Sequence, residues 1–537
     1  MLLMGQGGSG KTALVQEIAL PAIDFLFQPG ENSSGSPSLI VCAKWSQAEN
    51  ISTPANKAVT IHNATSMGIG KTRNSQMLPG DKKRVLQRTW ADLKLLVIEE
   101  VSMVSPQLYN MLLYRSWHGR AAGPDARECD YDTLTGAFGR MPIVIHLGDF
   151  LQLRPTGTGL SLITGDDEIR HRDIPAEFQF AMTLFQQTPL CFELIETNRF
   201  KDTALRELME FMRQSEPGST VPKSIQAIWR KMLLKKDDPR LSEDRFQVGH
   251  FLAIYWDSVS RSIVKRARRD AQALDKVLYV LQAADTCTPR MPLDLARKLA
   301  SVTNPGKTGE MHGMLPLHVG MHVRLLDHLD KGKGLVKDAE GEVVHVEVNP
   351  LDVDEVSRAQ AECRDAYLRH VPHGIWLRMA KYDGAPFVQR LRQHAGGISG
   401  EDAASLVFVE PGTQTFAWRG HSVSRTGFAL SHARVLTSTA CQGRTFRFGV
   451  VVDGGRRDGG AHPLSEDDFW LHLYVMLSRA TSVADILLAR PPPSAFLGRG
   501  PPAGLAAALR RFAARTQACR KQAGLLAKEF GLQVSDL

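Results

Sequence analysis

The chain has 537 residues, of which 43% are hydrophobic, and its 65 basic against 57 acidic side chains give a formal charge of +8, which favours an anionic partner. This length predicts three or four domains. No apolar stretch approaches the roughly 20 residues that span a bilayer, so we expect a soluble protein, and because no leader precedes the first strand, targeting information is either absent or was lost from a truncated start. The seven cysteines lie far apart, which excludes a zinc site or disulfide framework and leads us to expect an intracellular protein, in the nucleus or mitochondrion if the source is eukaryotic.

The chain opens with a short apolar strand, a glycine-rich turn and an apolar helical run. The turn contains Gly5, Gly7, Gly8, Ser9, Gly10, Lys11 and Thr12. Such a phosphate-binding loop points its N–H groups at a triphosphate, and the positive end of the following helix adds to their field. We expect Lys11 to contact the β- and γ-phosphates of ATP and the Thr12 hydroxyl to bind Mg²⁺.

Three further apolar runs predict buried strands of a parallel α/β domain, at Ser38–Ala43, Leu93–Ile98 and Met141–Leu147. Each run ends in polar residues, at the edge of the sheet where ligands bind in open parallel sheets. The second of these strands delivers Glu99 and Glu100. One acid can hold magnesium through water, while its neighbour orients or deprotonates the attacking water.

The strand ending near residue 147 is followed by Gly148-Asp149-Phe150-Leu151-Gln152. We expect the Gln152 amide to bond the γ-phosphate and to report its loss to the neighbouring loop. After about residue 190 the pattern changes. Helical segments are predicted at Asp202–Gln214, Ile225–Leu234 and Val259–Leu274. The last of these is basic, but basic runs are usually solvated faces, so we assign no site to it.

Short β-type runs separated by turns predict a small β-barrel or sandwich inserted in a larger domain. The predicted fold is therefore α/β, with two parallel-sheet P-loop lobes, a small inserted β domain and a basic helical tail. The predicted boundaries are 1–190 for the first lobe, 191–342 with 426–495 for the second, 343–425 for the β domain and 496–537 for the tail.

Together these motifs resemble the PIF-one-like helicases (petite integration frequency family), relatives of RecD in superfamily one. The resemblance covers roughly residues 1 to 490 and includes six further segments in the family's order. They are Glu100–Met103, Gly148–Leu153, Glu196–Phe200, Leu317–Leu326 with Lys333–Val336, Thr437–Thr445 and Leu473–Ala480.

The resemblance implies two RecA-like lobes with ATP and Mg²⁺ between them. The first lobe holds Lys11, Thr12, Glu99, Glu100 and Gln152, with Thr12 and Glu99 as the metal ligands. The second presents Arg199 and Arg479 across the cleft, where they neutralise charge on the transferred phosphoryl group, and Gln442 and Gly443 lie at the lobe interface.

The resemblance also implies 5′ to 3′ movement on single-stranded DNA, with forked DNA as a second ligand. The expected nucleic-acid contacts are Thr60, His62, Phe150, Arg154 and Thr437. We expect a monomer that acts in DNA repair, recombination or telomere maintenance, with replication or repair proteins as partners.

The chain departs from the family pattern at four places. Glu99 stands where the family has aspartate, Lys44–Asn50 lacks the family's Thr-Gly-x-Ala-Ala, and Thr439-Ala440 replaces His-Lys. The chain also begins at its first strand, so either an adenine-binding segment precedes it or base selectivity is relaxed. Two alternatives stay open: a DNA-stimulated ATPase or translocase without unwinding, and a DNA-binding relic with impaired catalysis.

Overall fold

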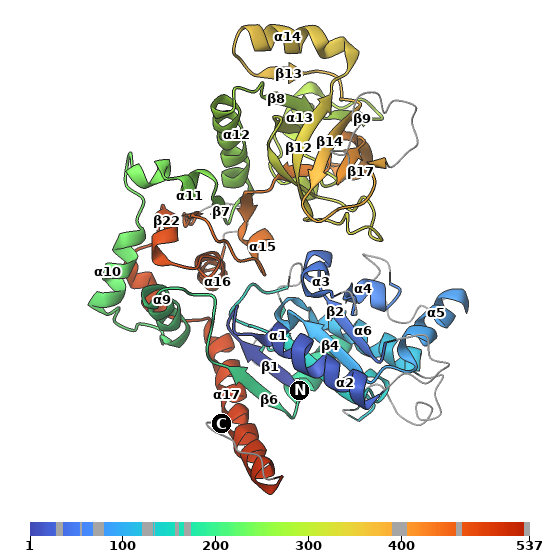
Figure 1. Ribbon diagram of the computed structural model, residues 1–537, viewed down its shortest axis with the longest axis vertical. Helices are drawn as coiled ribbons and strands as arrows, with labels where there is room; N and C mark the ends of the chain where they lie inside the picture. Colours follow the sequence, from blue (N-terminus) through green and yellow to red (C-terminus); the bar gives the residue numbers. More distant parts are fainter. Residues whose placement is uncertain are drawn as a thin grey trace.

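The structure is a computed structural model that describes residues 1–27, 36–53, 56–67, 80–120, 133, 135–155, 160–165, 173–388, 405–457 and 464–530. These residues form three bodies, at the lower right, left and top of Figure 1. The first two are α/β lobes and the third is built mainly of strands. Among the described residues, no helix combines the length and apolar character that crossing a membrane requires.

The first lobe is built on a six-stranded parallel sheet with the order β3-β2-β4-β5-β1-β6. Its strands are β1 Leu2–Gly5, β2 Ser38–Cys42, β3 Val59–Thr60, β4 Leu95–Glu99, β5 Ile143–Gly148 and β6 Cys191–Leu194. Side chains on β4 alternate between two cores, because helices cover both faces of the sheet. The strand order brings the loop after β1 beside the carboxyl ends of β5 and β4.

The helices of this lobe follow its strands in turn. They are α1 Lys11–Leu14, which continues through a π-helical turn at Val15–Ala19 into α2 Leu20–Leu26, then α3 Trp45–Ile51, α4 Ile61–Ala64, α5 Gly80–Trp90, α6 Pro106–Arg120 and α8 Ala176–Gln186. The loop between β1 and α1 is therefore the phosphate-binding turn that the sequence predicts.

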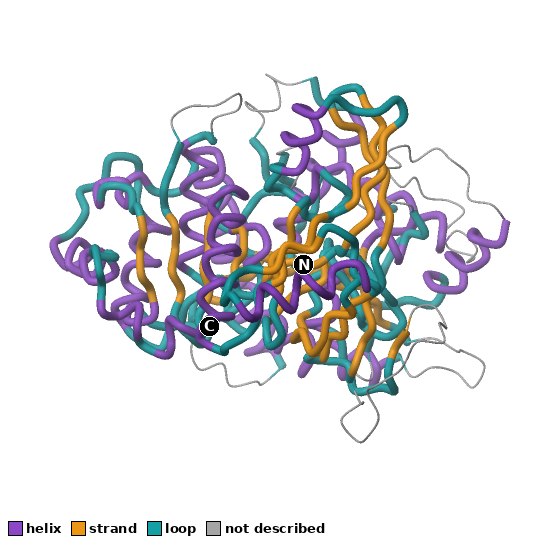
Figure 2. Tube along the Cα trace, turned by 90° about the horizontal axis from the view of Figure 1, so that it is seen from above, coloured by secondary structure: helices purple, strands orange, loops and turns teal. Residues whose placement is uncertain are grey.

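The second lobe has a four-stranded parallel sheet with the order β20-β7-β21-β22. Figure 2 shows these strands side by side on the left, with helices around them. The strands are β7 His250–Ala253, β20 Val435–Thr437, β21 Val450–Asp453 and β22 Ile486–Ala489. The helices are α9 Thr203–Gln214, α10 Lys223–Met232, α11 Asp244–Gln247, α12 Trp256–Ala273, α15 Ser438–Cys441 and α16 Glu466–Leu477.

The β domain is inserted between β7 and β20 of the second lobe and contains three small sheets around its own core. The strands are β8 Tyr279–Gln282, β9 Ala284–Cys287, β10 Met314–Leu317, β11 His322–Leu325, β12 Glu340–Glu347, β13 Ala366–Leu368, β14 Gly374–Met379, β15 Phe387–Val388, β16 Leu406–Val409, β17 Gly412–Trp418, β18 His421–Gly427 and β19 Leu430–His432. Helices α13 Leu293–Ala300 and α14 Val353–Ala361 complete it.

The last helix, α17 Ala503–Glu529, leaves the second lobe and packs against β6 of the first lobe. Its ring Phe512 stacks on Phe150 at a centroid distance of 6.4 Å. Arg520 donates from Nη2 to the carbonyl oxygen of Glu193 at 2.9 Å. The predicted helical tail is therefore a structural connection between the two lobes.

The predicted α/β fold class is confirmed, but the sheets draw the domain boundaries differently from the sequence. Strand β6 follows residue 190, yet it pairs with β1 and belongs to the first lobe. The β domain extends beyond 343–425 on both sides, because β11 pairs with β12 and β19, and β9 pairs with β18. These pairings join segments that are far apart in sequence.

Candidate active site

The phosphate loop after β1 requires glycine for two reasons, its backbone conformation and its close packing. Gly8 and Gly10 have φ angles of 84° and 88°, a left-handed conformation that other residues rarely adopt. A Cβ at Gly7 would lie 2.4 Å from Nη1 of Arg199, and one at Gly8 would lie 2.6 Å from the Arg199 Cβ. Glycine is therefore needed both for the turn and because Arg199 packs directly onto the loop.

Lys11 and Thr12 begin α1 at the end of this loop. The Nζ of Lys11 donates to the carbonyl oxygens of Gly5, at 2.7 Å, and Gln6, at 3.2 Å. The Oγ1 of Thr12 donates to Oε1 of Glu99 at 3.1 Å. The ammonium group thus lies within the loop and the hydroxyl group against the first acid, where a triphosphate and its metal ion need them.

The two acids at the end of β4 form a half-buried pair. Burial, and then the neighbouring Glu100 carboxylate, raise the pKa of Glu99 to about 8, although Lys11 and the hydrogen bond from Thr12 act in the opposite direction. The Oε2 atoms of Glu99 and Glu100 accept no hydrogen bond from the described residues. A divalent cation would supply the positive charge that this pair lacks.

Gln152 approaches the acids from the turn after β5. Its side chain is buried, and its Oε1 has no partner within the described ranges. Its backbone N–H donates to the carbonyl oxygen of Asp149 at 3.1 Å, which holds the turn closed. Among the described residues, the amide oxygen therefore faces the site unpaired.

Two arginines reach the same site from the segment after β6 and from the end of α16. Nη1 of Arg199 donates to the carbonyl oxygen of Ser478 at 3.2 Å, and Nε of Arg479 donates to that of Val475 at 3.0 Å. Burial, and next the nearby Arg479, lower the pKa of Arg199 to about 9. A buried cation, Arg479, beside the half-buried Arg199 favours a polyanionic ligand, because an uncompensated buried charge is costly.

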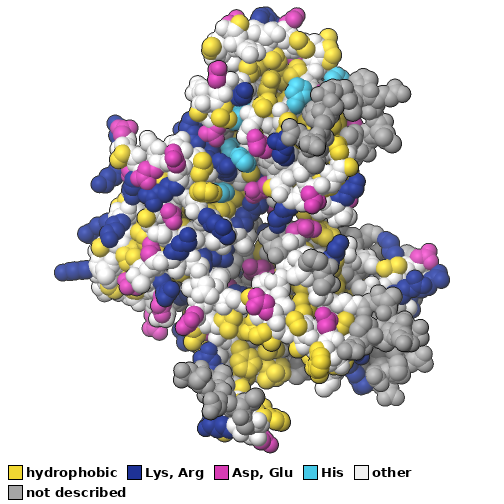
Figure 3. Space-filling view, viewed as in Figure 1, with side chains coloured by type: hydrophobic (Ala, Val, Ile, Leu, Met, Phe, Trp, Pro, Cys, Tyr) yellow, Lys and Arg dark blue, Asp and Glu magenta, His cyan; other side chains and the backbone are white. Residues whose placement is uncertain are grey.

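These side chains surround one cleft of about 860 Å³ between the lobes, and Figure 3 shows the hollow where the three bodies meet. The predicted nucleotide residues that line it are Gly7, Gly8, Ser9, Gly10, Lys11, Thr12, Glu99, Glu100, Gln152, Arg199, Gln442, Gly443 and Arg479. Gly5 lies beneath the loop, where its carbonyl group binds Lys11.

The cleft fits a nucleoside triphosphate with a divalent cation. In the part of the chain that the structure describes, Ser9 Oγ and both amide atoms of Gln442 also lack a hydrogen-bond partner. Buried polar groups are rarely unpaired, so these atoms indicate a polar ligand. No cluster of three His, Cys, Asp or Glu side chains occurs among the described residues. A Mg²⁺ ion bound with a triphosphate would need none, because phosphates and water would supply most of its ligands.

The predicted nucleic-acid residues occupy different environments. Thr60 and Thr437 are both buried, and each hydroxyl accepts a backbone hydrogen bond at 3.2 Å, from Asn63 and Ala440 respectively. They therefore act as N-caps of α4 and α15. His62 is half-buried on α4, and burial lowers its pKa. Arg154 is half-buried after the Gln152 turn.

The prediction that Phe150 contacts DNA is wrong for this structure. Its side chain is only 5% exposed. It packs against Phe185 at a ring distance of 5.7 Å as well as against Phe512 of α17. A ring enclosed in this way cannot stack on a base, so its role is to join α17 to the first lobe.

Sequence reasoning missed Lys44 and the β-domain loop 334–340, which both line the cleft. Nζ of Lys44 donates to the carbonyl oxygen of Thr439 at 3.5 Å, across the lobes, and burial lowers the pKa of Lys44. Its position directly after β2, a neighbour of β4, could have identified it. Part of this loop lies in Lys333–Val336, which the resemblance includes, but its place in the cleft depends on how the β domain packs and could not be predicted.

No protein-family model matches the chain, and no curated protein matches it. Solved structures do. A structure of two coordinating Pif1 helicases at forked double-stranded DNA is 17% identical, with a TM-score of 0.56, over 96% of this chain and 93% of that chain.

Two further matches cover nearly the whole chain. Pif1 helicase from Candida albicans is 18% identical, with a TM-score of 0.56, over 96% of this chain and 95% of that chain. Bacteroides Pif1 bound to single-stranded DNA is 17% identical, with a TM-score of 0.57, over 95% and 92%. At these identities the likeness establishes architecture. The chain therefore has the fold of the Pif1 helicases, with RecA-like α/β lobes on both sides of its cleft.

Proposed function

We propose that this protein is an ATP-dependent DNA helicase that moves along single-stranded DNA in the 5′ to 3′ direction. One observation carries the proposal: Lys11, Thr12 and Glu99 of the first lobe line the same cleft as Arg479 of the second. Such a site is completed only when the two lobes are together, so closure and hydrolysis are coupled. A solved Pif1 structure with ADP-AlF3 and single-stranded DNA supports both ligands.

Each side chain has a part in the proposed hydrolysis. Lys11 and the loop N–H groups bind the β- and γ-phosphates, and Thr12 and Glu99 hold Mg²⁺, which neutralises phosphate charge when bound. Glu100 orients the attacking water and accepts its proton. Gln152 donates its amide hydrogen to the γ-phosphate.

Two arginines complete the proposed site, Arg199 from the segment after β6 and Arg479 from the end of α16. Arg199 and Arg479 neutralise the charge that develops on the transferred phosphoryl group, an effect worth about 10³–10⁵ in rate in related enzymes. A carbonyl group just after α16 already binds Arg199, and one within α16 binds Arg479. Little reorganisation is therefore needed when the phosphate binds.

The proposed DNA ligands are single strands and forks, as in the solved structures named above. The formal charge of +8 supports a polyanionic partner. We further propose a monomeric enzyme in DNA repair, recombination or telomere maintenance, working with replication or repair proteins. This part rests on the family resemblance of the motifs.

A hydrolysis assay tests the enzyme. Wild type should turn over ATP faster when single-stranded DNA is added, and Lys11→Ala should reduce turnover by roughly 10²-fold or more, because the positive charge of the phosphate loop is lost. Lys82→Ala, on the exposed side of α5, is the matched control and should retain wild-type turnover. Equal, negligible turnover in wild type and Lys11→Ala would identify a DNA-binding relic instead.

A strand-separation assay tests the helicase. Duplexes with a 5′ tail, a 3′ tail or a fork are incubated with ATP, and the released strand is measured. We expect release from the 5′-tailed and forked substrates. ATP hydrolysis without release from any substrate would identify a translocase, and release from the 3′-tailed substrate alone would contradict the proposed direction.

A further inference from the structure

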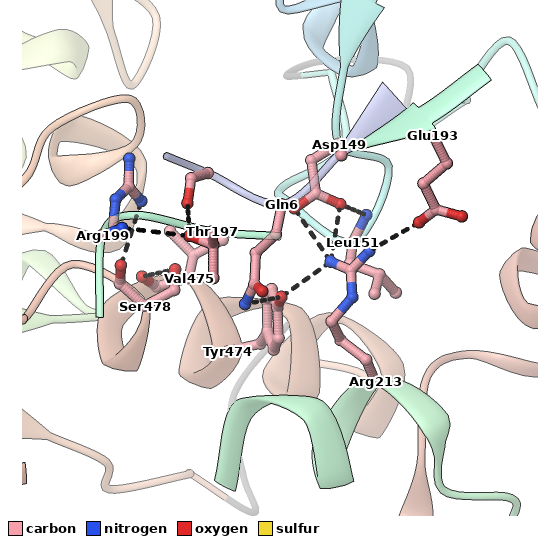
Figure 4. Close-up of polar contacts among 12 residues, drawn as sticks. Gln6, Asp149, Leu151, Glu193, Thr197, Arg199, Arg213, Tyr474, Val475 and Ser478 are labelled. Atoms are coloured by element: carbon pink, nitrogen blue, oxygen red, sulfur yellow. Dashed lines mark hydrogen bonds and ion pairs between the residues drawn. The ribbon is translucent and has the colours of Figure 1, made fainter. Parts of the chain in front are cut away.

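Beside the cleft, five polar side chains form a network that joins the lobes (Figure 4). Gln6, Asp149 and Glu193 belong to the first lobe, while Arg213 and Tyr474 belong to the second. Arg213 and Tyr474 do not line the cleft. We call this network the Arg213–Tyr474 junction.

Arg213 lies at the end of α9 and is the centre of the junction. Its Nη1 lies 3.2 Å from each carboxylate oxygen of Asp149 and donates to the Tyr474 hydroxyl oxygen at 3.0 Å. Its Nη2 lies 3.6 Å from Oε1 of Glu193. Burial lowers its pKa, but Tyr474, Asp149 and Glu193 together raise it above the ordinary arginine value. The guanidinium group therefore stays charged and joins both lobes.

Asp149 connects the junction to Gln152. Besides binding Arg213, its Oδ1 accepts a hydrogen bond from the backbone N–H of Leu151 at 3.2 Å, and its carbonyl oxygen accepts one from Gln152 at 3.1 Å. Asp149 is 4% exposed, so water does not compete strongly for these bonds. A displacement of Arg213 would thus move the turn that presents Gln152 to the cleft.

Tyr474 connects the junction to the phosphate loop and to Arg479. Its hydroxyl oxygen also accepts from Nε2 of Gln6 at 3.2 Å, and the Gln6 carbonyl oxygen accepts from Lys11 at 3.2 Å. The next residue of α16, Val475, binds Arg479 at 3.0 Å. Tyr474 is therefore linked to Lys11 through Gln6, and to Arg479 through the neighbouring residue Val475.

We propose that Arg213 and Tyr474 are positioning residues that fix the Gln152 turn and α16 relative to each other. Through them, Gln152 and Arg479 meet the γ-phosphate in one arrangement, although neither Arg213 nor Tyr474 contacts the nucleotide. The inference rests on the proposed function, because it assigns these residues to the hydrolysis step. A charged hydrogen bond in a buried site loses its orientation when one partner is removed.

Tyr474→Phe tests the inference because it removes one oxygen atom and keeps the ring. We expect kcat for DNA-stimulated hydrolysis to fall about tenfold, the equivalent of one hydrogen bond to a charged group, with KM for ATP changed less than about twofold. Tyr255→Phe is the matched control, because its hydroxyl accepts a 3.4 Å bond from Arg457 away from the cleft. The control should keep wild-type kcat.

A double-mutant cycle separates positioning from a merely structural role. Asp149→Asn weakens the other side of the junction, and Tyr474→Phe with Asp149→Asn should lower kcat much less than the product of the single effects. Arg213→Lys, which keeps the charge but loses the forked geometry, should behave like Tyr474→Phe. Multiplicative effects in the cycle, or a fall in melting temperature with unchanged kcat per folded molecule, would overturn the inference.

The outcomes also distinguish this inference from the proposed function. If wild type hydrolyses ATP and Tyr474→Phe matches Tyr255→Phe, only the positioning role fails. If wild type hydrolyses no more ATP than Lys11→Ala, the proposed function fails and the positioning role fails with it.

Discussion

Glu99 stands where the resemblance to the PIF-one-like helicases predicts an aspartate. Its side chain is one carbon longer than that of aspartate, yet its Oε1 accepts a hydrogen bond from the Thr12 hydroxyl at 3.1 Å. The second carboxylate oxygen has no partner within the described ranges. A glutamate here therefore still combines one bond to the loop with one oxygen free for a cation.

The raised pKa of Glu99 gives a stability prediction. The pKa rises from 4.5 to about 8 on folding, so the folded protein binds more protons than the unfolded chain between these values. The stability that this proton contributes is present below about pH 4.5 and is lost as the pH rises towards 8. Without divalent cations, the free energy of unfolding of wild type should therefore fall between pH 5 and 8 by roughly 1–3 kcal/mol more than that of Glu99→Gln, since one pKa unit is about 1.4 kcal/mol.

Thermal unfolding with a chelator at several pH values measures this difference. Glu207→Gln, on the exposed side of α9, is the control and should follow wild type. Parallel curves for wild type and Glu99→Gln would show that Glu99 does not hold a proton in the folded protein.

Both lobes contain the same local element, a strand that ends in a threonine and is followed by a helix of one turn. In the first lobe β3 ends in Thr60 and α4 follows, and in the second β20 ends in Thr437 and α15 follows. Each hydroxyl caps a helix of one turn. Short helices depend strongly on their caps, because they contribute few internal hydrogen bonds.

Substitutions at Thr60 separate capping from DNA binding. Thr60→Val should lower stability by about 1 kcal/mol, because the cap is lost, whereas Thr60→Asp retains a good cap. If Thr60 also lies against a DNA phosphate, Thr60→Asp should weaken single-strand binding severalfold through charge repulsion. Denaturant unfolding and fluorescence anisotropy with labelled DNA measure the two effects. Unchanged DNA affinity in Thr60→Asp would leave Thr60 with its capping role alone.

At the scale of the whole molecule, the two lobes share one continuous core. Buried side chains from the first sheet, from α9 and α16 and from α17 belong to one hydrophobic cluster. Phe512 connects them, because it belongs to the C-terminal helix and stacks on Phe150 of the first lobe. The two lobes are therefore joined through a common set of buried side chains.

Removal of the Phe512 ring should loosen that connection. Phe512→Ala should lower stability by about 3–5 kcal/mol, as expected for a large buried ring, whereas Leu525→Ala, at a position 61% exposed, should change it by less than about 0.5 kcal/mol. Hydrogen exchange at β6 is the measurement, because it reports on this connection directly. Slow exchange at β6 in Phe512→Ala would show that other contacts suffice.

The common place of three side chains in the cleft could be predicted from sequence, because each follows a buried strand within a few residues. Lys11, Glu99 and Gln152 needed only the rule that parallel strands present their carboxyl ends together. The environment of Phe150 could not be predicted, since it depends on Phe512 near the other end of the chain. The β-domain boundaries failed for the same reason, because β9 and β11 pair with strands that come much later.

Strand β6 is the outermost strand of its sheet and has one row of backbone groups without a neighbouring strand. Such edges recruit strands from other molecules and start aggregation. Helix α17 lies along this edge, where Cys519 Sγ accepts from the Cys191 N–H at 3.4 Å and Arg520 binds the Glu193 carbonyl oxygen. The final helix thus shields the molecule from polymerising through its own sheet.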